Sequence, residues 1–186
     1  MNSVELFAGA GGLGMGLHLA GFVPLEVVEW DRYCCDTIRE NKARHHSLVA
    51  DWPLTCADVR NVDFRRYEGK LDLISGGPPC QPFSLGGKHR AYADERDMFP
   101  EAIRAIREAR PKAFVFENVK GLTRVAFRNY FEYLKLQMEH PELVAHPDED
   151  WTEHLSRLER HHTGGSRDGL HYRVVARVLN AANYGV

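Results

Sequence analysis

The chain has 186 residues, of which 44% are hydrophobic and 27% are charged, so its composition is that of an ordinary globular protein. This length is enough for one domain with a hydrophobic core and too short for two domains of ordinary size. The net charge of −2 differs from the strong basic excess of a stand-alone DNA-binding domain, so we expect these residues alone to hold nucleic acid weakly.

Strands alternate with helices along most of the chain. Short apolar runs predict strands, and apolar residues at helical spacing predict helices. The strands are expected at residues 4–7, 25–29, in a short segment ending near Cys56, and at 70–75, 113–116 and 172–179. The helices are expected after the glycine-rich segment 8–16, at 33–44 and at 97–109. This order predicts an α/β fold with a parallel sheet covered on both faces, in which strands 70–75 and 113–116 are buried.

Residues 128–170 break this alternation. They combine helical segments with two His-Pro pairs and the run HHTGG at 161–165, which indicates an insertion of helix and flexible loop. The histidines there show no ligand spacing with acidic or thiol partners, so we predict solvated loop histidines and no metal site. Residues 1–186 are thus expected to form one domain with an insertion at about 128–170.

The four cysteines form no CxxC pair and no framework spacing. We therefore predict free thiols in a reducing cytoplasm, without a disulfide or a zinc site. No apolar run approaches the length of a membrane span, and the N-terminus lacks the layout of a signal peptide. The sequence predicts a cytoplasmic protein with no membrane partner.

A glycine-rich loop, FAGAGGLG at residues 7–14, follows the first expected strand. Such a loop lets the backbone approach a ligand closely, and the following helix N-terminus favours electron-rich groups. Alone this is weak evidence, because many nucleotide-binding folds use such a loop and some glycines only make turns.

Acidic residues follow the next two expected strands. Glu29 ends the second strand, where a carboxylate can bond both hydroxyls of a ribose. Trp30 offers a flat face for an adenine, and Asp58 can accept a bond from an exocyclic amine. Taken singly, Trp30 could equally be a core residue and Asp58 a helix cap.

The segment GGPPCQPFS at residues 76–84 is the most informative in the chain. Two glycines and two prolines end the fourth strand abruptly. They place Cys80 at the carboxyl ends of the strands, the edge at which open α/β sheets bind ligands. A thiol on rigid backbone there is a candidate nucleophile, whereas a lone cysteine is more commonly structural. Glu117 follows the next strand and is expected at the same edge, one strand away; the alternative is an ordinary surface acid.

These segments, with MFPE at 98–101, ENV at 117–119 and LNAANYGV at 179–186, resemble the DNA (cytosine-5)-methyltransferase family. The resemblance implies a Rossmann-like, S-adenosylmethionine-dependent methyltransferase sheet. It also implies methyl transfer to C5 of cytosine in double-stranded DNA through a covalent adduct on Cys80, with the target base flipped out. The loop 83–96 would close over that base. The chain departs from the family at Glu5, where Asp is usual.

The resemblance assigns the site residues in three groups. The catalytic residues would be Cys80 and Glu117. The cofactor-binding residues would be Phe7, Gly9, Ala10, Gly11, Gly12, Glu29, Trp30, Asp58, Val59 and Pro79. The residues that contact DNA would be Gln81, Ser84 and Asn118.

Family members continue beyond the last matching segment. They add an arginine motif that holds the target base, a strand that returns to the sheet, and a target-recognition domain. We therefore expect the sheet to be incomplete at its C-terminal end and the chain to act as part of a longer or split enzyme, with a second polypeptide as one source of these parts.

Three other functions stay open. A tRNA cytosine-5 methyltransferase would share the fold, and only the PFS segment at 82–84 and the glycines at 86–87 favour the DNA enzymes. A nicotinamide-dependent oxidoreductase would explain the glycine loop but neither the PPCQ nor the ENV segment. A cofactor-binding subunit that is inactive alone would retain the cofactor residues.

Overall fold

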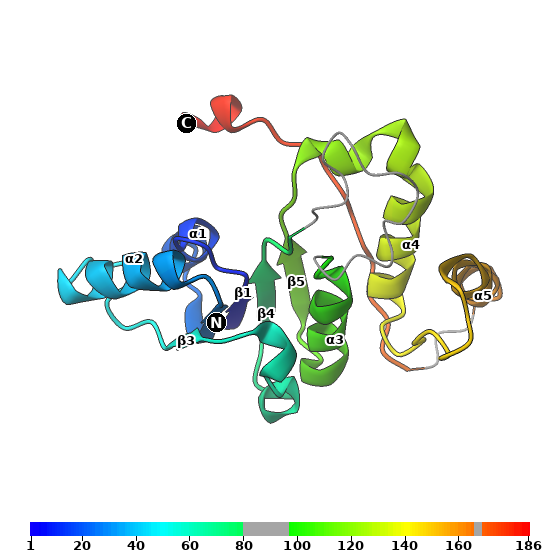
Figure 1. Cartoon of the computed structure of the whole chain (residues 1–186), viewed down its shortest axis with the longest axis horizontal. Helices are drawn as coiled ribbons and strands as arrows, with labels where there is room; N and C mark the ends of the chain where they lie inside the picture. Colours follow the sequence, from blue (N-terminus) through cyan, green and yellow to red (C-terminus); the bar gives the residue numbers. More distant parts are fainter. Residues whose placement is uncertain (80–96, 166–168) are drawn as a thin grey trace. The chain divides into compact units, whose positions relative to one another are not determined.

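The computed structural model describes residues 1–79, 97–165 and 169–186. These residues form two compact units, Met1–Asn118 and Val119–Val186, which can be followed by colour in Figure 1. In these ranges no helix is long and apolar enough to cross a membrane.

A parallel five-stranded sheet is the centre of the first unit. In spatial order its strands are β3 (Leu54–Cys56), β2 (Val23–Glu29), β1 (Asn2–Leu6), β4 (Leu73–Gly76) and β5 (Ala113–Phe116). The chain moves outward from β1 to β3 on one side and then adds β4 and β5 on the other. The strand order therefore reverses between β1 and β4, which opens a crevice at the carboxyl ends of these strands. The predicted α/β fold with a parallel sheet is confirmed.

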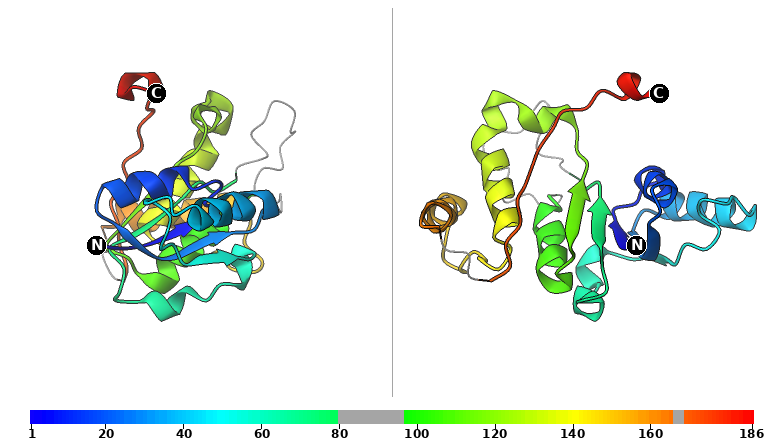
Figure 2. Two further views of the ribbon diagram at one scale, coloured as in Figure 1. Left: turned by 90° about the vertical axis from the view of Figure 1, so that its left-hand side faces the viewer. Right: turned by 180° about the vertical axis from the view of Figure 1, so that it is seen from behind.

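Helices cover both faces of this sheet (Figures 1 and 2). On one face, α1 (Gly12–Leu19) and α2 (Arg32–Ala43) lie over a buried cluster that includes Val27 and Trp52. On the other, α3 (Phe99–Ala109) and the short turns η1 (Val59–Asn61) and η2 (Phe64–Tyr67) share a cluster with Val28. Val27 and Val28 belong to different clusters because successive side chains of a strand point to opposite faces.

β5 is less buried than the sequence predicts. Its bounds match the prediction, but Ala113 and Val115 are exposed, and only Phe114 and Phe116 pack partly against the core. Within the described sheet β5 has a neighbour on one side only. The predicted burial was wrong because an apolar run does not distinguish a central strand from an edge strand.

The predicted strand at 172–179 is not a strand. This segment has no regular secondary structure before the short turn η7 (Ala181–Tyr184), and Val175, Val178 and Leu179 are exposed. Figure 2 shows the segment as the red tail that ends in η7. The prediction failed because alternating side chains cannot make a strand without a hydrogen-bonded neighbour, and the described residues provide none here.

The helices of the second unit lie within residues 128–170, where the sequence predicts helical segments and loop. This unit begins with η5 (Lys120–Thr123) and η6 (Val125–Phe127), followed by α4 (Arg128–Glu139) and α5 (Trp151–Thr163). A capping box at Asp150 and Glu153 fixes the start of α5, because each side chain accepts a backbone N–H of the other residue.

Two histidines of this unit are buried, so the prediction of solvated loop histidines was wrong for them. His140 and His154 are 5% and 1% exposed. His154 lies one helical turn from buried Leu158 on α5, and its ring nitrogens bond the hydroxyl of Tyr133 at 2.8 Å and the carbonyl of Leu143 at 2.7 Å. His154 is therefore a hydrogen-bonded core residue, which its spacing from Leu158 could have indicated.

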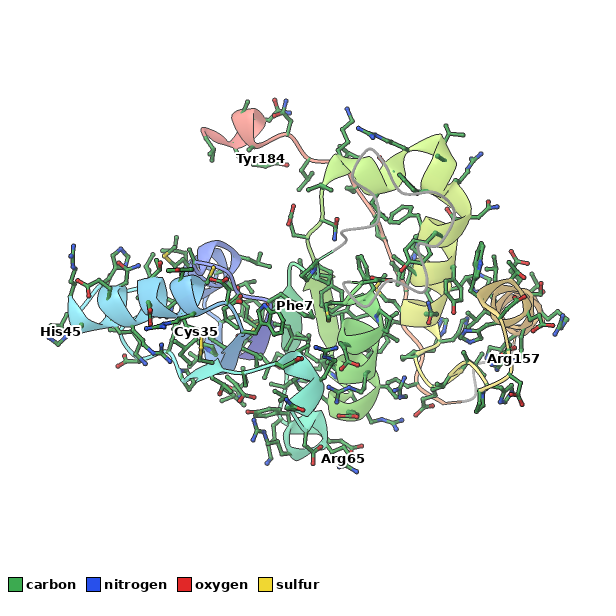
Figure 3. All side chains as sticks on the ribbon, viewed as in Figure 1. Phe7, Cys35, His45, Arg65, Arg157 and Tyr184 are labelled. Atoms are coloured by element: carbon green, nitrogen blue, oxygen red, sulfur yellow. A yellow bond between two sulfur atoms is a disulfide. The ribbon has the colours of Figure 1, made fainter. Side chains whose placement is uncertain are left out.

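Cys35 and Cys56 form a disulfide, with their Cα atoms 6.1 Å apart (Figure 3). The prediction of four free thiols was wrong for this pair, whereas Cys34 is free. The bond joins α2 to the end of β3 across 21 positions of sequence. Sequence spacing carried no signal for it, because the packing of α2 on the sheet brings the two sulfurs together.

Candidate cofactor and active site

A pocket of about 610 Å³ lies at the carboxyl edge of the sheet, where the strand order reverses. Small-molecule sites commonly have volumes of roughly 300–1,000 Å³. Its lining comes from the end of β2, from the segments that follow β1, β2, β3 and β4, and from the N-cap of α3. The lining residues are Phe7, Gly9, Val28, Glu29, Trp30, Asp31, Ala57, Asp58, Val59, Arg60, Gly77, Pro79 and Met98.

Glu29 connects the glycine loop to the end of β2. Its Oε2 accepts the N–H of Gly9 at 2.7 Å, and its Oε1 accepts the N–H groups of Trp30 at 2.8 Å and Asp31 at 2.7 Å. A carboxylate has about four acceptor positions, so one is left, on Oε2 beside Gly9. Glu29 can therefore accept one ligand hydroxyl without losing a backbone bond, rather than the two that the sequence suggested.

The glycine loop is supported from below by Glu5 and Trp52, both only 2% exposed. Oε1 of Glu5 accepts the N–H of Gly14 at 3.0 Å. A Cβ at Gly14 would overlap the Glu5 carboxylate and the Trp52 ring, and one at Gly11 would lie 2.8 Å from that ring. Gly11 also has φ +95°, a left-handed conformation that favours glycine. These two glycines are therefore required by the turn and by packing.

Burial raises the pKa of the Glu5 carboxyl to about 7, although the bond from the Gly14 N–H acts in the opposite direction. The protonated form is favoured because few polar groups surround this carboxyl to replace water. Glu5 is thus a titrating group placed directly beneath the candidate cofactor loop.

Asp58 is paired with Arg60. Its Oδ1 accepts the Arg60 backbone N–H at 2.9 Å and caps η1, and its Oδ2 accepts Nη2 of Arg60 at 2.6 Å. Nε of Arg60 lies 3.0 Å and 2.9 Å from the two oxygens, and these bonds lower the pKa of Asp58. The helix-cap interpretation is thus what the structure shows. An amine could bond Asp58 only by displacing the guanidinium.

The turn that leads to Cys80 is held on two sides. The side-chain amide of Asn118, after β5, donates to the Pro78 carbonyl at 2.9 Å, and the N–H of Met98 donates to the Pro79 carbonyl at 3.2 Å. Glu117 donates its N–H to the Gly76 carbonyl at 3.0 Å. Its carboxylate is directed toward the end of β4, because a Cβ built on Gly77 would lie 3.7 Å from Oε2.

The sequence profile of the C-5 cytosine-specific DNA methylases matches residues 1–142. The chain belongs to this family. Among curated relatives, the type II methyltransferase M.AquIA of Picosynechococcus sp. is 34% identical over 184 residues, which are 98% of this chain and 66% of that protein. M.PspPI of Psychrobacter sp. is 48% identical over 120 residues, which are 64% of this chain and 27% of that protein. The chain thus spans between about a quarter and two thirds of the length of these relatives.

Solved structures of two methyltransferases have a related fold. A DNA modification methyltransferase encoded within an E. coli prophage superposes with a TM-score of 0.51 at 29% identity, over 72% of this chain and 37% of that one. DNMT2 of Spodoptera frugiperda gives a TM-score of 0.52 at 21% identity, over 74% of this chain and 41% of that one. The second likeness concerns the fold alone.

The structure brings together most of the cofactor residues expected for a C-5 cytosine-specific DNA methylase. Those that line the pocket are Phe7, Gly9, Glu29, Trp30, Asp58, Val59 and Pro79. Ala10 and Gly11, in the turn before α1, and Gly12, the first residue of α1, do not line it. Cys80, Gln81, Ser84 and the loop 83–96 lie outside the described residues.

Sequence reasoning missed several pocket residues of this methylase-family chain. Gly77 joins the lining from the turn after β4, Met98 from the N-cap of α3, and Arg60 from η1. Met98 lies in the MFPE segment that carries the resemblance, but only the folded chain shows that this residue lines the pocket. Arg60 could have been found from the Asp-x-Arg pattern, in which the arginine can bond the capping carboxylate.

Proposed function

We propose that this chain supplies the catalytic part of an enzyme that methylates C5 of cytosine in double-stranded DNA, with S-adenosylmethionine as the methyl donor. In this proposal Cys80 is the nucleophile and Glu117 binds the target base. The observation that supports it most strongly is the pocket at the β1–β4 reversal, adjoining the Pro78–Pro79 turn that leads to Cys80, in a chain of the C-5 methylase family.

The pocket residues fit an adenosine-containing ligand. Trp30 is 69% exposed and lines the pocket, so its ring is accessible for stacking on an adenine. The remaining acceptor position of Glu29 suits one ribose hydroxyl. Val28 and Met98 add apolar walls. The N-terminus of α1 and the glycine loop would hold the methionine part.

The chemistry needs both Cys80 and Glu117. S-adenosylmethionine, when bound, supplies an electrophilic methyl group. The Cys80 thiolate would add to C6 of cytosine, which makes C5 nucleophilic, while Glu117 at the N3 and N4 edge stabilises the charge developing on the ring. After methyl transfer, a base removes the C5 proton, the C5–C6 double bond re-forms and the thiolate leaves.

We also propose that DNA recognition resides outside residues 1–186, either further along a longer chain or on a second polypeptide. The chain covers only part of the length of its relatives, and its net charge of −2 gives weak attraction to phosphates. Within the described sheet β5 is an edge strand with a neighbour on one side only, so the sheet could be extended there by a further strand.

Calorimetry tests the cofactor part of this proposal on the 186-residue chain. We expect binding of S-adenosylmethionine and of its demethylated product, and no comparable binding of NAD. Glu29→Ala should weaken the binding by about 1.5–3 kcal/mol, the scale of a lost hydrogen bond to a charged group. Tighter binding of NAD than of both methionine-derived ligands would contradict the proposal and favour an oxidoreductase.

A trapping experiment tests the chemistry in an enzyme completed with its recognition part. A DNA duplex with 5-fluorocytosine at the target should form a stable adduct, because fluorine cannot leave C5 as a proton does. Cys80→Ser should abolish the adduct, and Glu117→Gln should slow it while cofactor binding is retained. Adduct formation with tRNA but not with DNA would assign the RNA substrate instead.

A further inference from the structure

The ends of α4 and α5 bring three metal-ligating side chains together. Nε2 of His140 lies 3.2 Å from Nδ1 of His162, and this Nδ1 lies 3.3 Å from Oε2 of Glu139. One ligand atom from each of the three residues lies within 4.8 Å of the others. All three residues belong to the second unit, whereas the residues that line the pocket described above belong to the first.

We propose that Glu139, His140 and His162 bind a zinc ion, with water at the fourth position. Zinc–nitrogen and zinc–oxygen bonds of about 2.0–2.2 Å in a tetrahedron place neighbouring ligand atoms roughly 3.3–3.6 Å apart. The separations of 3.2 Å and 3.3 Å are close to this, so small side-chain movements admit the ion. Two imidazoles and one carboxylate suit zinc better than calcium or magnesium, which prefer oxygen ligands.

The electrostatics of the cluster favour a cation. Glu139 ends α4 and His162 lies in the last turn of α5, so the negative ends of both helix dipoles point to the cluster.

Neighbouring groups hold the ligands in position. Oε1 of Glu139 accepts the N–H of Val174 at 3.2 Å, which leaves Oε2 directed at His162. The Glu139 carbonyl accepts the N–H of Tyr172 at 3.0 Å. The ring of His171 packs against that of His140, with centroids 4.9 Å apart. An ion here would therefore fasten α4, α5 and the start of the C-terminal segment to one another.

Metal titration of the tag-free 186-residue chain tests the site. We expect one Zn²⁺ per chain by calorimetry, and visible absorption of a tetrahedral site when Co²⁺ replaces it. His162→Ala and Glu139→Gln should each weaken binding by roughly tenfold to more than a hundredfold, at least the scale seen when a group that supports a ligand is lost. His162 is 47% exposed, so its replacement should leave the fold intact, which circular dichroism checks.

His146→Ala is the matched control, because His146 is an exposed histidine of the same unit that bonds Glu149 through its backbone N–H and carbonyl, which alanine retains. It should bind Zn²⁺ as the wild type does. Hydrogen exchange adds a second readout: Zn²⁺ should slow exchange of the Tyr172 and Val174 amides in the wild type but not in His162→Ala.

Three results would overturn the proposal. One is the absence of stoichiometric binding, and another is equal binding by the wild type, His162→Ala and Glu139→Gln. The third is thiolate-to-cobalt absorption in the near ultraviolet, or loss of binding after the cysteines are blocked, since either would place the ion on cysteine residues.

Discussion

At the scale of single residues, Glu5 couples the core to the candidate cofactor loop. An acid with a raised pKa is held preferentially in its protonated form by the fold, so folding becomes less favourable once the unfolded chain releases that proton. The pKa of Glu5 rises from 4.5 to about 7. Its contribution to stability is therefore full below pH 4.5, falls between pH 4.5 and 7, and is lost above pH 7.

We predict that Glu5→Gln removes this pH dependence. The wild type should lose up to about 3 kcal/mol of unfolding free energy from Glu5 between pH 4.5 and 7, which is about 2.5 pKa units, and the variant should not. Urea unfolding at pH 5 and pH 8 measures the difference. Glu159→Gln, an exposed change on α5, should behave as the wild type does. Equal pH responses in all three proteins would show that Glu5 does not titrate in this way.

The pairing of Asp58 with Arg60 yields a second prediction. If the adenine amine bonds Asp58, it must displace the guanidinium, so Arg60→Ala should tighten the binding of the demethylated cofactor by roughly twofold to tenfold, well within the scale of one charged hydrogen bond. Calorimetry measures the change. Asp63 and Arg65 form the same capped pair at η2, outside the pocket lining, so Arg65→Ala should have no effect. Weaker binding by Arg60→Ala would instead mean that Arg60 contacts the ligand.

At the scale of elements, the disulfide ties the support of the pocket together. Cys56 ends β3, and the next residues, Ala57 and Asp58, line the pocket. Cys35 lies on α2, whose N-cap Asp31 comes two residues after Glu29. A bond between α2 and β3 therefore restrains two adjoining parts of the pocket wall.

We predict that reduction of this disulfide destabilises the chain. Closure of a 21-residue loop contributes at most about 3 kcal/mol by constraining the unfolded state. Urea unfolding with and without reductant measures the effect, and Cys56→Ser should not respond to reductant. A thiol assay on the unreduced wild type should detect two of the four cysteines. Four reactive thiols before reduction would show that the bond does not form.

The sequence pattern predicted the strands and helices that short runs of residues determine. It failed where a strand also needs a neighbouring strand to pair with. β3 and β5 were found because apolar runs end at clear polar or proline boundaries. The segment 172–179 has a similar pattern but no strand to pair with among the described residues, so it is not a strand. In the pocket, Gly9 was predicted from the glycine-rich loop and Glu29 from its position at a strand end. Met98 and the supporting ring of Trp52 come from distant segments of the chain. Contacts of that kind depend on the folded chain.

At the scale of the whole molecule, cofactor binding and DNA methylation should be separable. Every described residue that lines the pocket belongs to the unit Met1–Asn118, whereas recognition of DNA is proposed to lie outside residues 1–186. The candidate zinc site belongs to the other unit. Each of these features can therefore be tested without the others.

We predict that the purified 186-residue chain binds the cofactor but transfers no methyl group to DNA above the background of Cys80→Ser. The flipped base and the duplex would lack partners, although the pocket is present. Transfer of a tritiated methyl group to a mixed-sequence duplex measures this, with calorimetry on the same sample as the control for a folded site. Robust, site-specific methylation by the chain alone would contradict the prediction.

The order of the strands also bears on synthesis of the protein at the ribosome. β1 is made first and pairs with both β2 and β4, and all five strands are complete by Phe116. N-terminal units generally fold first as a chain emerges. We expect the nascent protein to reach a cofactor-competent state once residue 118 has cleared the exit tunnel, before α4 and α5 have formed. The cofactor would then stabilise the incomplete nascent chain. Its concentration in the cell would therefore influence how much of the protein escapes degradation during translation.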